Sequence, residues 1–167
     1  ITNIGTAHLE QLGSKKKIFE AKMEITHFMH EKDILLINGE DEFLREVDKA
    51  GYRPTIKTFG FSNSCDYFCK DYFYREDYTE ICAVIDGFEV NYTIPSLGKH
   101  NILNSVSALG VASALKMDVE KATIGLLDFQ PSKLRMQMEK RAGITIINDS
   151  YNANPDSVKS VLSILAE

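Results

Sequence analysis

Four places in this sequence, three polar clusters and one lysine, have residue types and spacing that could do chemistry. The first is a cluster that ends at His8. It spans residues 3–8 (NIGTAH) and follows an apolar start. We expect residues 1–5 to form a buried strand that leads into a loop. Ligands of open α/β sheets bind beyond the carboxyl ends of such strands, and a neutral imidazole can ligate a metal or hold a phosphate. A surface histidine without such a role fits these residues equally well.

The second candidate is Lys22. Apolar residues recur at helical spacing over residues 14–29, which predicts a helix that buries one face, formed by Ile18, Ala21, Ile25, Phe28 and Met29. Lys22 lies on or beside that face. A buried ammonium is costly unless it is paired or chemically changed. A lysine whose stem packs while its amine reaches solvent is the more common explanation.

The third cluster, residues 98–104 (GKHNILN), leads into an expected helix over residues 101–117. Free N–H groups at the start of a helix bind anions or the edges of ligands. Asn101 and Asn104 lie one turn apart on one face, and an amide that both donates and accepts suits the edge of an adenine. A purely structural role for Asn101 as a helix cap is equally consistent with the sequence.

The fourth cluster, residues 148–155 (NDSYNANP), lies between an expected strand and an expected helix. Asp149 follows the strand, where acidic residues often accept hydrogen bonds from ribose hydroxyls. Arg135 is a planar donor that could bind phosphate, although a solvated position is the default for an arginine. The sequence contains no GxxxxGK[ST] phosphate loop.

Alternating strands and helices must position these clusters. We expect buried strands over residues 33–39, 55–61 and 144–148, and a charged amphipathic helix over 41–50. This alternation predicts an α/β fold with a largely parallel sheet. Residues 66–95 are rich in β-forming residues around Asp86-Gly87, a strong hairpin signal, and predict a small antiparallel meander.

The last part of the chain has a different organisation. Asp118 is expected to cap a helix that ends at residue 127, and the architecture breaks near Pro131. Asn154 as N-cap and Pro155 at the first position predict a final helix, whose apolar stripe is Val158, Val161, Leu162 and Leu165. We therefore expect two parts, residues 1–131 and 132–167.

Composition excludes several classes of protein. The chain has 167 residues, a net charge of −5 and 44% hydrophobic residues, which is ordinary for a globular protein and excludes disordered and fibrous classes. No apolar run approaches the length of a membrane span, and no basic stripe indicates nucleic-acid binding. Cys65, Cys69 and Cys82 form no CxxC pair, which favours a reducing, cytoplasmic setting.

In their order and separation, the three clusters and Lys22 resemble the motifs of the Mur ligase family. The matching strings are ITNIGTAHLEQLGS, IFEAKMEI, LGKHNILNSVSALGVA and ITIINDSYNANPDSVKS. The YNANP string is typical of the branch that adds D-Ala-D-Ala to UDP-MurNAc-tripeptide in peptidoglycan synthesis. The resemblance implies the latter part of a mostly parallel central ATPase domain with a small antiparallel meander, followed by the start of a Rossmann-like C-terminal domain. It also implies a monomeric cytoplasmic enzyme that uses ATP and Mg²⁺.

The resemblance further implies roles for individual residues. His8 and a carbamylated Lys22 would help to bind Mg²⁺, and carbamylation would convert a costly cation into an anion that pairs with the metal. Arg135 would reach the γ-phosphate. The nucleotide would be bound by Asn104 at the adenine with His100 and Asn101 beside it, and by Asp149 at the ribose. Tyr151 and Asn152 would complete the nucleotide-binding residues.

The implied reaction is ATP-dependent amide ligation through an acyl phosphate, which the amine of D-Ala-D-Ala attacks. The sequence differs from the family at Met23, where a glycine is usual. The chain also starts and ends as if cut, so the phosphate loop is expected before Ile1, and we expect these 167 residues alone to be inactive. Another Mur or folylpolyglutamate-type ligase, or a noncatalytic module that retained the fold, are the alternatives.

Overall fold

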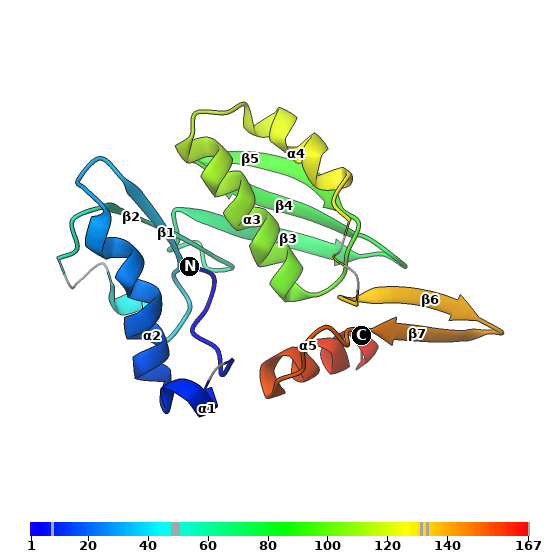
Figure 1. Cartoon of the computed structure of the whole chain (residues 1–167). Coiled ribbons are helices and arrows are strands. Elements are labelled where there is room, and N and C mark those ends of the chain that lie inside the picture. The colour runs from blue at the N-terminus through cyan, green and yellow to red at the C-terminus, as the bar shows by residue number, and fades with distance from the viewer. Residues whose placement is uncertain (8, 48–50, 131, 133, 167) are drawn as a thin grey trace.

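A five-stranded mixed sheet forms the centre of the molecule (Figure 1). The computed structural model describes residues 1–7, 9–47, 51–130, 132 and 134–166. The strands lie in sequence order: β1 (Ile34–Asn38), β2 (Thr55–Gly60), β3 (Tyr67–Tyr74), β4 (Thr79–Ile85) and β5 (Phe88–Ile94).

The first three strands are parallel, whereas β3, β4 and β5 pair antiparallel. The α/β fold class and the meander are therefore confirmed. However, the meander is not a separate unit, because β3 pairs in parallel with the end of β2 and makes the sheet continuous. Asp86 and Gly87 both have positive φ angles, as a tight two-residue hairpin requires.

Helix α3 (Lys99–Ala114) packs along one face of this sheet and builds the larger core, and α4 (Val119–Leu127) lies beside it. Ile102, Val106 and Leu109 of α3 are fully buried among the inward-facing residues of β3, β4 and β5. Gly110 is required by this packing, because a Cβ atom there would lie 2.6 Å from the Tyr67 ring. The Asp118 carboxylate caps α4 by accepting a hydrogen bond from Lys121 N, as predicted.

A second core lies under α1 (Leu9–Leu12) and α2 (Lys15–Met23). Helix α2 continues directly as the 3₁₀ helix η1 (Glu24–Phe28). Ser14 caps α2, but the expected buried face is only partly confirmed: Ile18 is buried and Met29 packs against the second core, whereas Ala21, Ile25 and Phe28 are exposed. Ile18 and Met23 are buried, whereas Ile25 is 58% and Phe28 88% exposed. A 3₁₀ helix has 3.0 residues per turn and not 3.6, so the apolar positions after Met23 rotate away from the face of Ile18.

Two other expected elements are absent from the described residues. Residues 1–5 form no strand: Ile1 exchanges two backbone hydrogen bonds with Leu36 and Asn38, but Ile4 N turns to the Asp41 side chain. The expected helix over 41–50 is, in its described part, only the short 3₁₀ helix η2 (Leu44–Glu46). The Asp41 carboxylate accepts from two nearby backbone N–H groups, and this local bonding favours a tight turn.

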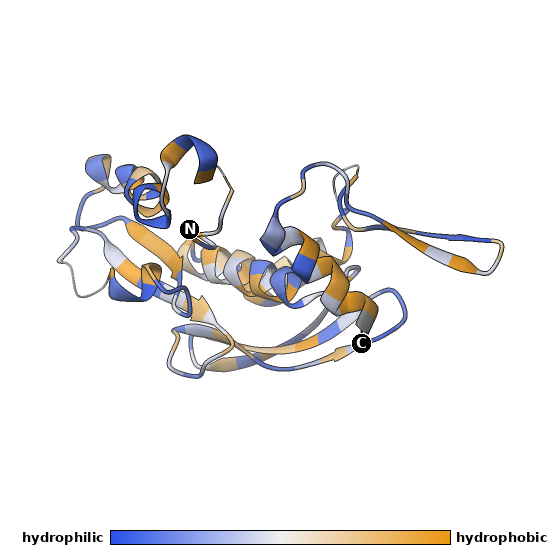
Figure 2. Cartoon of the chain, turned by 90° about the horizontal axis from the view of Figure 1, so that it is seen from below, coloured by the Kyte–Doolittle hydropathy of each residue, from blue (hydrophilic) through white to orange (hydrophobic). Residues whose placement is uncertain are grey.

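The last part of the chain comprises a hairpin of β6 (Gln137–Arg141) and β7 (Ile144–Asn148), followed by α5 (Pro155–Ala166). The hairpin projects away from the central sheet (Figure 1). Strand β7 is expected to be buried, but among the described residues it pairs only with β6, and Ile144 is 65% exposed. Figure 2 shows hydrophobic segments along α5 and the hairpin.

The expected boundary at residue 132 remains a prediction. It agrees with the burial pattern, since the buried hydrophobic side chains of the described residues all lie between residues 4 and 112. None of the described helices is long and apolar enough to cross a membrane.

Candidate functional site

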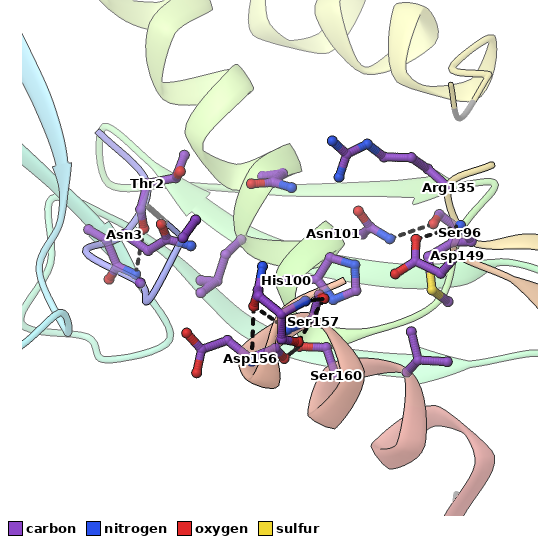
Figure 3. Close-up of a pocket in the computed structure, with 18 of the residues that line it drawn as sticks. Thr2, Asn3, Ser96, His100, Asn101, Arg135, Asp149, Asp156, Ser157 and Ser160 are labelled. Atoms are coloured by element: carbon purple, nitrogen blue, oxygen red, sulfur yellow. Dashed lines mark hydrogen bonds between the residues drawn. The ribbon is translucent and has the colours of Figure 1, made fainter. Parts of the chain in front are cut away.

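A cavity of about 490 Å³ lies where the N-terminal loop, the start of α3 and the last part of the chain meet (Figure 3). Its walls come from residues 2–7, from the ends of β1 and β2, and from residues 96–104. The opposite wall comes from residues 129–161. Of the residues expected to form a site, the cavity brings together His100, Asn101, Asn104, Arg135 and Asp149.

The start of α3 is shaped by Gly98. Its φ of 97° is a conformation that side chains disfavour, and a Cβ atom there would lie 2.9 Å from both His100 and Ile164. Asn101 uses its amide nitrogen locally, donating to Ser96 Oγ at 2.7 Å and to the Leu97 carbonyl at 2.9 Å. Asn101 therefore fixes the loop before α3. It is not the helix cap that the sequence allowed, because Gly98 is the N-cap and no side chain caps this helix.

Asn104 differs from Asn101. It lies one turn further along α3, is exposed and lines the cavity. Its side chain has no hydrogen-bond partner among the described residues, so both its donor and its acceptor remain available to a ligand.

His100 lies in the first turn of α3 and lines the cavity. Burial of its side chain lowers the pKa of the imidazole, and the nearby Asp149 carboxylate opposes this effect only in part. Because desolvation has the larger effect, His100 is neutral at neutral pH and can both donate and accept a hydrogen bond.

The opposite wall carries one anion and one cation. Asp149 follows β7, and its carboxylate accepts a hydrogen bond from Met136 N at 3.1 Å. The guanidinium of Arg135 lies 4.4 Å from the centre of the Tyr151 ring, a cation–π contact that orients it. Tyr151 and Asn152 are exposed and do not themselves line the cavity.

Lys22 lies at the edge of the site and not inside it. Its side chain is exposed, so it lies beside the buried face of α2 and not on it, in agreement with the more common explanation for such a lysine. Its amine donates a 2.7 Å hydrogen bond to the carbonyl of Asn3, which lines the cavity. Met23, the departure from the family pattern, points into the second core and is 4% exposed.

His8 lies outside the described residues. Within the described ones, no three His, Cys, Asp or Glu side chains lie close enough together to hold a metal ion by themselves.

Sequence reasoning missed the contribution of α5. Asp156, Ser157 and Ser160 all line the cavity. The first turn of α5 is held by Asn154, whose side-chain oxygen accepts from the N–H groups of Asp156 and Ser157, both at 3.0 Å. An acidic residue in the first turn of a helix was the available signal, but it usually indicates only helix stabilisation.

Taken together, the cavity offers a free amide on one wall and a carboxylate with a guanidinium on the other. An amide suits the edge of a heterocycle, a carboxylate accepts from hydroxyl groups, and a guanidinium binds anionic oxygens. This arrangement is suited to a ligand that carries all three kinds of group.

Comparisons with known proteins show the family of the chain. Residues 1–112 match the Mur ligase middle domain. The chain is 34% identical over 165 residues to the UDP-N-acetylmuramoyl-tripeptide–D-alanyl-D-alanine ligase of Bacillus subtilis, covering 98% of this chain and 35% of that protein. It therefore spans about a third of the length of the curated relatives it matches.

Solved structures give the same result. MurF from Acinetobacter baumannii superposes with a TM-score of 0.90 at 28% identity, covering 98% of this chain and 36% of that one. MurF ligase from Thermotoga maritima in complex with ADP superposes with a TM-score of 0.86 at 25% identity, covering 99% and 38%. With a family match over two thirds of its residues and this fold, the chain belongs to the Mur ligase family.

Proposed function

We propose that the protein adds D-Ala-D-Ala to UDP-MurNAc-tripeptide in an ATP-dependent reaction of peptidoglycan synthesis, and that this chain supplies part of its ATP site. The observation that carries the proposal is the cavity that brings Asn104 together with Arg135 and Asp149 from opposite walls. The similarity to D-alanyl-D-alanine ligases over 98% of the chain supports the choice of substrates.

In this proposal the adenine lies against the start of α3. Asn104 offers an unpaired amide to the base edge, and the neutral His100 lies beside it. Asp149 accepts from the ribose hydroxyls. Arg135, oriented by Tyr151, reaches the phosphates and stabilises charge on the transferred group.

Mg²⁺ would lie at the end of the cavity near Asn3, where the described residues do not by themselves form a complete set of metal ligands. Mg²⁺ is usually held by only one or two protein ligands, water and substrate phosphates, so a cage is not required. Lys22 places its amine beside Asn3 at the cavity edge, and a carbamate on that amine would add an oxygen ligand there. When bound, Mg²⁺ would neutralise phosphate charge.

The proposed reaction has two steps. A carboxylate oxygen of the tripeptide attacks the γ-phosphorus and ADP leaves, which gives an acyl phosphate. The amine of D-Ala-D-Ala then attacks the acyl carbon, loses a proton and displaces phosphate. The chain positions and neutralises charge in these steps, which are the main requirements of phosphoryl transfer. Because the sequence contains no GxxxxGK[ST] loop, we propose that the 167 residues alone are inactive.

Nucleotide binding tests the site directly. In the full-length protein, Asn104→Ala should weaken ADP binding about tenfold, since loss of an amide that pairs with the base costs roughly 1–2 kcal/mol. Calorimetry measures this change. Asn91→Ala is the matched control, because Asn91 is an exposed asparagine on β5 outside the cavity. Equal affinities for both variants would contradict the placement of the adenine.

A sister ligase is the second candidate function. The chain is also 31% identical over 163 residues to a UDP-N-acetylmuramoylalanine–D-glutamate ligase of Lachnoclostridium phytofermentans. Phosphate release by the full-length protein, measured with D-Ala-D-Ala or with D-glutamate and the corresponding UDP-muramoyl substrate, separates the two. Turnover with D-glutamate alone would overturn our assignment.

A further inference from the structure

One contact joins the two ends of the chain across the cavity, and neither the proposed reaction nor the family resemblance uses it. A single oxygen of the Asp156 carboxylate, Oδ2, accepts two hydrogen bonds from Thr6: from the backbone N at 3.0 Å and from Oγ1 at 2.8 Å. The two residues are 150 positions apart, and both line the cavity.

Both partners are held in place by their own elements. Asp156 lies in the first turn of α5, where the Asn154 side chain accepts from its backbone N at 3.0 Å. On the other side, Ile4 N donates to the Asp41 carboxylate at 2.7 Å, which ties the loop before Thr6 to the end of β1. Figure 3 shows Asp156 on α5 at the edge of the cavity.

The local chemistry favours the ionised form of Asp156. The Thr6 hydroxyl and then the Thr6 N–H lower the pKa of this carboxyl, and Lys15 and Lys159 add to the effect. An anionic acceptor with two converging donors makes a stronger contact than a neutral pair.

Residues 1–131 and 132–167 share another polar contact, the ion pair of Lys140 on β6 with Glu76 between β3 and β4. Its side chains are 65% and 75% exposed, and surface ion pairs of this kind contribute little. The Thr6–Asp156 contact is also exposed, but there one carboxylate oxygen accepts two hydrogen bonds, one of them from the backbone, and the contact lies on α5 itself. It is therefore the stronger candidate for holding α5 against the N-terminal loop.

We propose that Asp156 is a positioning residue that holds α5 against Thr6 and thereby sets the width of the nucleotide cavity. The link to a nucleotide rests on the proposed function, whereas the link to cavity width does not. Asp156 acts through Thr6 and the placement of α5 and makes no contribution to the chemical steps.

The distance across the cavity tests this proposal without any nucleotide. Spin labels are attached in this chain at Lys17→Cys on α2 and Ser163→Cys on α5, two exposed positions outside the cavity. Cys65 and Cys69 are buried with raised thiol pKa values and should label poorly, and Cys82 is replaced by serine. Pulsed electron resonance then gives the distribution of label distances.

Asp156→Ala should broaden this distribution and shift it to longer distances. Asp156→Asn should largely retain it, since one amide oxygen can accept both hydrogen bonds. Glu76→Ala, which removes the exposed ion pair between the same two parts, is the matched control and should have little effect. An unchanged distribution in Asp156→Ala, in a chain whose circular dichroism is that of the parent, overturns the proposal.

A second measurement uses ADP with the full-length protein. Asp156→Ala should weaken ADP binding about three- to tenfold, with Thr6→Val intermediate, and the two effects should not add because both remove the same contact. Tighter binding in Asp156→Ala would overturn the proposal, because it would show that the carboxylate competes with phosphate for Thr6. If the unaltered protein binds no ADP, the proposed function fails, while the distance measurement still decides the role of Asp156.

Discussion

Lys22 shows how one side chain can lie near a site without lying in it. Its amine is bonded to the Asn3 carbonyl, so it reaches the cavity edge from an exposed position on α2. An exposed amine has ready access to dissolved carbon dioxide, and a carbamate formed there would face the same edge. The proposed modification therefore does not depend on the lysine being buried.

Lys22→Ala in the full-length protein should lower the rate of ligation about a hundredfold or more, because it removes the proposed carbamate beside the reacting phosphate. Added acetate or formate should restore part of the activity by supplying a carboxylate. Steady-state phosphate release measures both effects. Lys17→Ala, which removes another exposed lysine of α2, is the control. Full ligation by Lys22→Ala without any added carboxylate would show that the assigned role is wrong.

His100 should make the stability of this chain depend on pH. Its folded-state pKa is lowered by burial from the ordinary value of 6.5, with Asp149 opposing the shift. The unfolded chain therefore takes up the proton first as pH falls. The stabilising contribution is present above about pH 6.5 and is lost progressively as pH falls toward the folded-state pKa.

Urea unfolding at pH 7.5 and 5.5 measures this contribution. The parent chain should lose more stability between the two values than His100→Gln, which cannot titrate. The quantity to compare is the loss of unfolding free energy in the parent chain minus that in His100→Gln, because the contributions of carboxylates that titrate in both proteins cancel in this difference. Identical losses would contradict a half-buried, neutral His100.

At the scale of the elements, the change from α2 to η1 decides which apolar residues reach the core. Met23 is the last residue of α2 and is buried, whereas Ile25 in η1 is exposed. Met23, at the position where glycine is usual in the family, fills space among Ile4, Leu35 and other residues of the second core. Its larger side chain thus packs and does not enter the cavity.

Met23→Ala should lower the free energy of unfolding by about 2–4 kcal/mol, the usual range for truncating a buried methionine. Ile25→Ala, which removes a mostly exposed side chain two residues later, should change it by less than about 1 kcal/mol. Chemical unfolding followed by circular dichroism measures both. Similar losses in the two variants would mean that η1 does not turn Ile25 away from the core.

In the whole molecule, the cores and the cavity draw on the last part of the chain to different extents. The buried residues of both cores lie between residues 4 and 109, whereas the cavity takes one wall from residues 129–161. The last part of the chain therefore contributes to the site more than to the cores.

A chain that ends at residue 130 should consequently unfold cooperatively, with a free energy within about 1–2 kcal/mol of the parent, because it keeps every buried hydrophobic side chain of the described residues. Urea unfolding and the heat-capacity change of thermal unfolding measure this. Loss of cooperative unfolding would show that the last part of the chain is needed to complete a core.

The sequence by itself determined most of the local structure. Asp86-Gly87 specified a hairpin because few residues tolerate two successive positive φ angles, and Asn154-Pro155 specified the start of α5. The motifs also named five residues that the cavity brings together. These signals are readable because they act between residues that are close in the chain.

Only the tertiary structure decided what depends on contacts between distant residues. The mixed sheet depends on β2 pairing with β3, and the Thr6–Asp156 contact joins residues that are 150 positions apart. The periodicity of residues 14–29 suggested a single helical face, but the change to a 3₁₀ turn after Met23 rotated half of it into solvent. Burial and long-range hydrogen bonds are properties of the packed molecule, so no local pattern could specify them.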